Sequence, residues 1–251
     1  MTMHSRQMAA GETSPAIRRL ESLADLGPQA REALATAAER RQMVKGGREL
    51  VGDRQEYKAL ILLSGWAARV RLLQDGRRQL LGLFLPGDVI GCCDLPAPVA
   101  TCAIMTLTAS TICVAPGCGL PDLERAYALS RALDEAFLLA QIARLGRMDA
   151  REKLSDFLLE LNERLVPSGL SHGGRFTLPL TQELLADVLG LTAVHVNRTL
   201  QIMRRDGDIV WNGGEMILRN PAQLANAIGR PPMVVSVSNA SARFGSFQPS
   251  V

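Results

Sequence analysis

The residues best placed for chemistry with another molecule lie between Thr181 and Gly207. Thr181 can cap a first helix, QELLADVL, which Gly190 would end in a left-handed conformation. Thr192 can cap a second helix, AVHVNRTLQIMRRD, which stops at Gly207. Two short capped helices with a tight turn between them are typical of a helix-turn-helix. The sequence therefore predicts that motif in this segment.

The second predicted helix has an apolar face and a polar face. The apolar face should pack against the first helix, and its residues are Val196, Leu200 and Met203, opposite Leu185, Val188 and Leu191. The other face carries hydrogen-bonding and cationic groups near the helix N-terminus, as a recognition helix needs in order to reach base edges in the major groove. Its members are Val194, His195, Asn197, Arg198 and Gln201.

Each group on this surface suits a particular contact with double-stranded DNA. Arg198 suits guanine, and His195 or Asn197 suits a base or a phosphate. Thr181 and Gln182, at the start of the first helix, can hold phosphate through side-chain and backbone N–H groups. The predicted DNA-binding residues are Thr181, Gln182, Thr192, Val194, His195, Asn197, Arg198, Gln201 and Arg204.

The alternative interpretation is an ordinary helical hairpin with a solvated polar face. The two caps argue against it, and so does the Asn212-Gly213-Gly214 turn between two predicted strands, which would form a wing. Between residues 149 and 220, however, eight Arg and Lys stand against ten Asp and Glu. Affinity for DNA would therefore have to come from the local cluster of Arg198, Arg204 and Arg205 and not from a broadly basic domain.

Cysteines are the second group of residues with possible chemistry. The five lie in one stretch, at positions 92, 93, 102, 113 and 118. Cys92, Cys93 and Cys102 are the candidates for effector or redox chemistry; the alternatives are small buried hydrophobes, a thiol switch, and a metal or cluster site. No C-x-x-C spacing occurs, so no metal site is predicted. The histidines, His4, His172 and His195, lie outside the predicted strands, which argues against haem there.

These residues must be positioned by an α+β scaffold. Between Arg48 and Val114, short runs of Leu, Ile and Val alternate with turn residues, which predicts an N-terminal antiparallel β-barrel or jelly roll. Asp75-Gly76 gives the strongest hairpin signal. Two short helices, broken at Gly27-Pro28, should precede the strands.

A long helix is predicted after Pro121, because no Gly or Pro interrupts the chain until Gly146. One apolar stripe is spaced by three and four residues, and a second lies beside it, as expected for a helix that packs on its own barrel and pairs with a partner helix. The alternative is a single amphipathic helix on its own core. The first stripe is Ala126, Leu129, Leu133, Ala136, Ala140 and Ala143, and the second is Leu138, Ile142 and Leu145.

The chain is thus divided into five parts. They are a flexible tail (1–15), a barrel domain (16–120), a dimerisation helix with a hinge (121–148), a winged helix-turn-helix that Asp149 can open as a helix cap (149–228), and a disordered tail (229–251).

Composition excludes several classes of protein. The chain has 251 residues, of which 47% are hydrophobic and 21% charged, enough for real cores and too apolar for disorder. It has no run of about 18 apolar residues and no secretory leader pattern, so we expect a cytoplasmic protein that is not inserted in a membrane. No Ser/His/Asp set, Walker loop or HExxH motif occurs, and we predict that the protein is not an enzyme. The net charge of +3 permits nucleic acid without requiring it.

The order of barrel, long helix and winged helix-turn-helix resembles the CRP/FNR family of bacterial transcription regulators, whose barrel is similar to cyclic-nucleotide-binding domains. The resemblance covers roughly residues 20–225. It is most specific in LPLTQELLADVLGLTAVHVNRTLQIMRRDGDI and is supported by LSGWAARVRLLQDGRRQLLGLFLPGDVIG. It implies a homodimer paired through residues 121–146, a hinge near residues 147–149, two major-groove half-sites of a pseudo-palindrome, and RNA polymerase as a further partner.

Two departures from the family pattern affect what is recognised. Many members have a base-reading Glu where this chain has Val194, although Arg198 matches the usual base-reading Arg. Members that bind cyclic AMP have a Glu and an Arg-Ser pair at positions that correspond to Cys92 and to Thr101-Cys102 here. Without a cation to neutralise a buried cyclic phosphate, cyclic AMP is not expected as the effector.

The leading hypothesis is therefore a dimeric, sequence-specific transcription regulator. Its barrel would either sense an unidentified signal or serve as a structural platform for dimerisation, and no cofactor is predicted. The competing hypothesis is a thiol-redox or metal-sensing regulator that uses the barrel cysteines.

Overall fold

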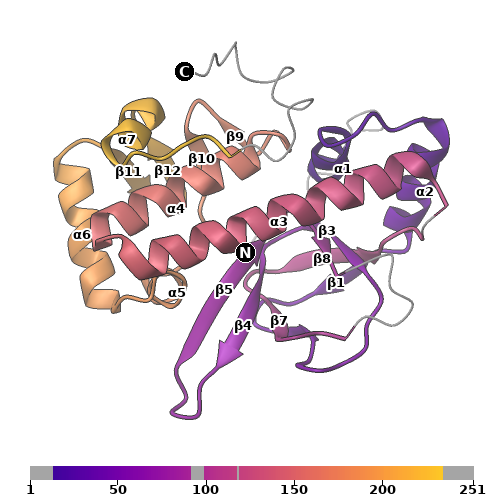
Figure 1. The fold of residues 1–251 in the computed structure, drawn as a ribbon, viewed down its shortest axis with the longest axis horizontal. Coiled ribbons are helices and arrows are strands. Elements are labelled where there is room, and N and C mark those ends of the chain that lie inside the picture. Colours follow the sequence, from indigo (N-terminus) through magenta and orange to yellow (C-terminus); the bar gives the residue numbers. More distant parts are fainter. Residues whose placement is uncertain (1–13, 92–98, 118, 234–251) are drawn as a thin grey trace, which may run out of the picture.

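The computed structural model describes residues 14–91, 99–117 and 119–233. Its long helix α3 (Pro121–Arg147) runs the length of the molecule (Figure 1). Helices α1 (Pro15–Glu21) and α2 (Pro28–Glu39) lie beside its N-terminal end, and the C-terminal unit lies beside its other end. No helix in the described ranges is long and apolar enough to cross a membrane.

The N-terminal strands form two four-stranded antiparallel sheets. One has the order β1 (Gln42–Val44), β8 (Ser110–Val114), β3 (Leu60–Ser64) and β6 (Val89–Ile90). The other has the order β2 (Glu49–Val51), β7 (Ala103–Thr106), β4 (Ala67–Leu72) and β5 (Arg78–Phe84). An apolar cluster that includes Val51, Leu62 and Ile104 draws on both sheets. No pairing of described strands closes them into a barrel, so the architecture is that of a jelly roll.

The predicted hairpin joins β4 to β5. Leu72 is paired with Arg78, and Gly76 has the positive φ of 82° that the turn requires. Asp75 accepts a hydrogen bond from the Arg77 backbone N–H at 3.0 Å, which closes the turn.

Helix α4 (Ala150–Leu165) opens the C-terminal unit with the predicted cap. The Asp149 carboxylate accepts from the Glu152 backbone N–H at 2.9 Å, and the Glu152 carboxylate accepts from the Asp149 N–H at 2.8 Å, which makes a complete capping box. Beyond α4 lie β9 (Ser171–His172), β10 (Arg175–Thr177), α5 (Gln182–Leu189), α6 (Ala193–Arg205), β11 (Ile209–Asn212), β12 (Glu215–Leu218) and α7 (Pro221–Ala227). The sequence analysis identified α5, α6, β11 and β12 but not β9, β10 or α7.

The stripes predicted on α3 have different surroundings along the helix. Ala126 is buried, and Leu129 and Leu133 pack against the core formed with α1 and α2. The large apolar side chains left exposed on α3 are Leu139, at 60%, and Ile142, at 67%. The face available to a partner helix is therefore centred on these two residues and not on the first predicted stripe.

The two halves of the chain share one hydrophobic core. A single cluster of buried side chains contains Trp66, Leu80 and Leu83 from the jelly roll together with Phe157 and Leu189 from the C-terminal unit. The boundary predicted from sequence between residues 120 and 149 therefore does not separate two independent cores. The boundary predicted at residue 229 precedes Arg230, whose buried side chain pairs with Asp156 and Glu163 of α4.

We expect the two halves to unfold together, because they share this core. Of the two tryptophans, Trp66 lies in the jelly roll and Trp211 lies in β11, so Trp66→Phe and Trp211→Phe each leave one fluorescent reporter. Denaturation midpoints of the two variants should coincide. Leu83→Ala should lower both midpoints together, at a cost of about 2–5 kcal/mol. Two separate transitions, with only one of them shifted, would contradict a shared core.

Candidate nucleic-acid interface

The helix-turn-helix forms as the caps predict. The Thr181 hydroxyl accepts from the Leu184 N–H at 3.2 Å, and the Thr192 hydroxyl accepts from the His195 N–H at 3.2 Å. Gly190 ends α5 in the left-handed region with φ of 62°. These local bonds fix where both helices begin and therefore which side chains of α6 face outward.

The apolar face of α6 is completely enclosed. Val196, Leu200 and Met203 have no exposed surface, and they share a cluster with Leu185 and Val188 of α5. Leu191 is only partly buried but packs against the same cluster. The helix is thus held at a fixed rotation about its own axis.

The opposite face of α6 is exposed, as predicted. Val194 is 80% exposed, and His195, Arg198, Gln201 and Arg204 are exposed as well. An apolar side chain this exposed in the first turn of a helix packs against little of its own chain, so it is free for an apolar contact elsewhere.

Asn197 has a different environment from its neighbours. It is half-buried, and its amide nitrogen donates to the Gln182 side-chain oxygen at 2.9 Å. This hydrogen bond ties the first turn of α5 to α6. Two residues that the sequence assigned to separate DNA contacts are therefore joined to each other.

A groove of about 460 Å³ separates the start of α5 from the β11–β12 wing. Thr181 and Gln182 line one side of it, and Trp211 and Gly213 line the other. Arg204 also lines the groove and contacts the wing, since its guanidinium lies 5.8 Å from the centre of the Trp211 ring and donates to the Trp211 carbonyl at 3.4 Å. The sequence analysis did not single out Trp211, because its position in a predicted strand indicated only secondary structure.

Most acids of this unit already have partners within the protein, which reduces the effect of its net negative charge on DNA. Arg151 of α4 donates to Asp206 at 2.6 Å and to Asp208 at 2.5 Å, which neutralises the two acids that follow α6. The hydrogen bond with Asp206 is the main cause of the raised pKa of Arg151. The other acids between residues 149 and 220 cap helices or have a basic partner: Asp149, Glu152, Asp156, Glu160, Glu163, Glu183, Asp187 and Glu215.

The comparisons with known proteins agree with this geometry. A model of the Crp-like helix-turn-helix domain matches residues 152–227. The chain is 31% identical to the transcriptional activator protein FnrL of Cereibacter sphaeroides, over 66% of this chain and 70% of FnrL. It is 32% identical to the transcriptional activatory protein AadR of Rhodopseudomonas palustris, over 79% of this chain and 85% of AadR.

The chain belongs to the CRP/FNR family of transcription regulators. The solved structure of FixK2 from Bradyrhizobium japonicum, 27% identical, covers 74% of this chain and 95% of its own length with a TM-score of 0.64. Members of the family are regulators of transcription and not enzymes. This CRP/FNR protein is accordingly a DNA-binding transcription regulator, as the sequence predicted.

Arg69, on the described part of the jelly roll of this CRP/FNR protein, is already paired with a carboxylate. The guanidinium of Arg69 on β4 donates to both carboxylate oxygens of Asp134 on α3, at 2.7 and 2.6 Å, and lies 4.3 Å from the centre of the Phe84 ring. A guanidinium already engaged in this way is not available to neutralise a second anion. The names of the FNR-type relatives agree with the expectation that cyclic AMP is not the effector.

The described cysteines are buried in the jelly roll. Burial raises the pKa of the Cys113 thiol to about 11, and burial also raises the pKa of the Cys102 thiol, against the opposing effect of Arg69. Both groups are therefore protonated near neutral pH, whereas reactive sensor cysteines are thiolates. Cys92 and Cys93 lie outside the described residues. Within the described ranges, no three His, Cys, Asp or Glu side chains gather as a metal site would require.

We expect Cys102 and Cys113 to resist alkylation in the folded protein. At pH 8 only about one Cys113 thiol in a thousand should be ionised, and the thiolate fraction should rise about tenfold per pH unit up to the pKa. Iodoacetamide labelling, read residue by residue by peptide mass spectrometry, tests this expectation. Labelling of both residues in guanidinium chloride is the positive control. Rapid labelling of native Cys102 at pH 7 would instead support a thiol switch.

Proposed function

We propose that this chain binds a pseudo-palindromic operator as a homodimer and places one α6 helix in the major groove of each half-site. The observation that carries the proposal is the capped α6, whose enclosed apolar face holds Val194, His195, Arg198 and Gln201 outward. A dimer whose recognition helices are one turn of duplex apart, about 34 Å, would read both half-sites at once.

We assign the base contacts to the exposed residues of the first turns of α6. Arg198 makes no ion pair within the described part of the chain, so its guanidinium can donate to both acceptors of a guanine. Val194 offers a thymine methyl an apolar contact, and His195 and Gln201 can reach neighbouring bases. Asn197 contributes mainly by holding Gln182 in place.

The phosphate contacts fall at the groove between α5 and the wing. The N-terminus of α5, which the Thr181 hydroxyl caps, and the side-chain amide nitrogen of Gln182 favour a phosphate oxygen there. Thr192 and Arg204 lie at the start and the end of α6, where the backbone on either side of the major groove would pass. We propose that a strand of the sugar-phosphate backbone passes along this groove.

Dimerisation is assigned to α3, through residues 121–146. Leu139 and Ile142 lie three residues apart on one exposed face, and a partner helix would remove this apolar surface from water. RNA polymerase is the further partner that we propose, since the relatives FnrL and AadR are named as transcriptional activators. We also propose a location in the bacterial cytoplasm, where the chromosomal DNA lies.

Arg198→Ala should relax sequence preference, because it removes a base contact. We expect affinity for a selected operator to fall by about 1–3 kcal/mol, with little change on random duplex. Thr181→Ala should weaken binding to both duplexes alike, and Thr181→Ser, which keeps the hydroxyl, should bind like the wild type. Fluorescence anisotropy at fixed salt measures all four affinities. An equal loss on both duplexes for Arg198→Ala would refute its assignment as a base reader.

Ile142→Glu should convert the dimer into monomers, because a carboxylate would be buried without a partner in the helix–helix interface. Sedimentation velocity measures the oligomeric state. Val166→Glu is the matched control, since Val166, the C-cap residue of α4, is an apolar residue of similar exposure, at 51%, on another helix. A dimer that persists in Ile142→Glu would show that the interface lies elsewhere.

A further inference from the structure

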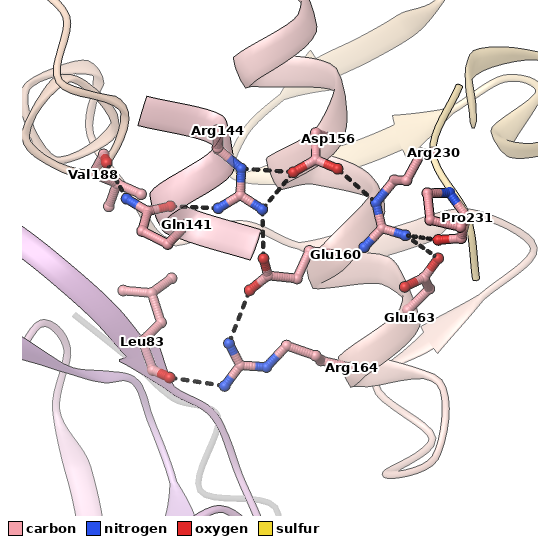
Figure 2. Close-up of polar contacts among 10 residues, drawn as sticks. All are labelled: Leu83, Gln141, Arg144, Asp156, Glu160, Glu163, Arg164, Val188, Arg230 and Pro231. Carbon is pink, nitrogen blue, oxygen red and sulfur yellow. Dashed lines mark hydrogen bonds and ion pairs between the residues drawn. The ribbon is translucent and has the colours of Figure 1, made fainter. Parts of the chain in front are cut away.

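The junction between α3 and α4 is built around a buried guanidinium (Figure 2). Arg144, near the end of α3, is only 1% exposed. Its guanidinium donates to Gln141 at 2.5 Å, to Asp156 at 2.7 Å and to Glu160 at 2.5 Å. The angle between the two helices is therefore set by directional, charge-assisted hydrogen bonds.

A second buried guanidinium connects this junction to the jelly roll. Arg164, near the end of α4, donates to the Leu83 carbonyl of β5 at 2.7 Å and to the Asp88 carboxylate at 2.6 Å. It also donates to Glu160 at 3.1 Å, so the two oxygens of Glu160 bind Arg144 and Arg164 separately. Burial alone would lower the pKa of Arg164, but the carboxylates of Asp88 and Glu160 outweigh it and raise this pKa, which keeps the group charged.

The same junction holds the helix-turn-helix. The Gln141 amide donates to the Val188 carbonyl at the end of α5, at 2.6 Å (Figure 2). From the other side, Gln79 of β5 donates to the carbonyls of Asp187 and Val188, at 2.6 and 3.2 Å. Because α6 packs on α5, this network links the orientation of α6 to that of α3.

Stability alone does not explain why such a junction is charged. An apolar junction of similar volume is often as stable as a buried ion pair, because both charges must lose their hydration. A cavity of about 20 Å³, large enough for one water molecule, lies beside Arg144, Glu160 and Arg164. The junction thus contains a small void, and its hydrogen bonds supply a fixed geometry.

We propose that Arg144 and Arg164 are positioning residues that set the distance between the two recognition helices of the dimer, and hence the half-site spacing that the protein accepts. The inference rests on the proposed function, since it requires a dimer on a two-part operator. An added base pair moves one half-site about 3.4 Å along the duplex and rotates it by about a tenth of a turn. A rigid junction cannot follow that change, whereas a loosened junction can.

Arg144→Lys and Arg164→Lys test the proposal, because in each variant the buried carboxylates keep a positive charge beside them. Lysine keeps the charge but lacks the planar fork that reaches two or three acceptors at once. Gln141→Leu is a third variant, which removes the neutral link to α5 and leaves Arg144 with both of its carboxylates. Arg175→Met is the matched control, because Arg175 and Glu215 form an exposed pair outside the network.

The measurement is the affinity for an operator selected with the wild-type protein and for copies whose spacer is one base pair longer or shorter. The wild type and Arg175→Met should lose about tenfold in affinity on each altered spacer, a cost comparable to one mismatched base pair. The three network variants should bind the altered spacers to within about threefold of the selected one, while Arg198→Ala still weakens each of them. Circular dichroism identifies any variant that is not folded. The spacing preference of the folded variants decides whether the proposal holds.

Two outcomes separate this inference from the function on which it rests. If the wild type selects a palindrome and the network variants keep its spacing preference, the positioning role is overturned and the proposed function stands. If the wild type selects no two-part site, the proposed function fails, and the inference fails with it.

Discussion

The arrangement of this molecule depends on the burial of the Arg144 guanidinium. A charge that is 1% exposed is tolerable only if carboxylates reach it, and Asp156 and Glu160 do so because they are four residues apart and lie on one face of α4. The residue at which α4 begins decides which of its faces lies toward α3. The capping box of Asp149 and Glu152, directly after α3, fixes that point. A local cap and a buried charge thus together determine how the long helix meets the DNA-binding unit.

Pairing inside the unit also shapes its outer electrostatic field. Asp156, Glu160 and Glu163 are occupied by arginines on the inner side of α4, and Asp206 and Asp208 by Arg151. Acids paired at this distance contribute little potential beyond about one Debye length, roughly 8 Å at physiological ionic strength. These paired acids therefore add little to the field above α6, where Arg198, Arg204 and Arg205 lie, although the unit as a whole has more acids than bases.

What the sequence could predict follows from the range of the interactions. The helix-turn-helix was predictable because Thr181, Gly190 and Thr192 act on residues within one helical turn, and the β4–β5 hairpin because Asp75 and Gly76 form the turn themselves. The two-residue strand β9 could not be identified, because its pairing with β10 is its only support.

The charged junction was hidden for a related reason. In the sequence, Glu160 and Arg164 have the i, i+4 spacing of an ion pair on a solvated helix face, and Arg144 belongs to another helix. Only the packing of α3, α4 and the jelly roll shows that all three are buried. The exposed face of α3 was not resolved from its two apolar stripes either, since both have helical spacing and Leu139, which is exposed, belongs to neither. Only the position of the other elements decides which residues of α3 are covered.

The chemistry of α6 explains why a fixed geometry would matter to this protein. With Asn197 bound to Gln182, the first turns of the outward face offer one guanidinium, one imidazole, one amide and one apolar side chain, from Arg198, His195, Gln201 and Val194. Each good base contact discriminates by only about 1–3 kcal/mol, so a single module can distinguish few sequences. Two modules on a rigid frame add a requirement that neither has alone, namely the distance and rotation between their sites. A protein with few base contacts gains selectivity from that requirement only if the junction between α3 and α4 is rigid. Directional hydrogen bonds from buried guanidinium groups provide that rigidity.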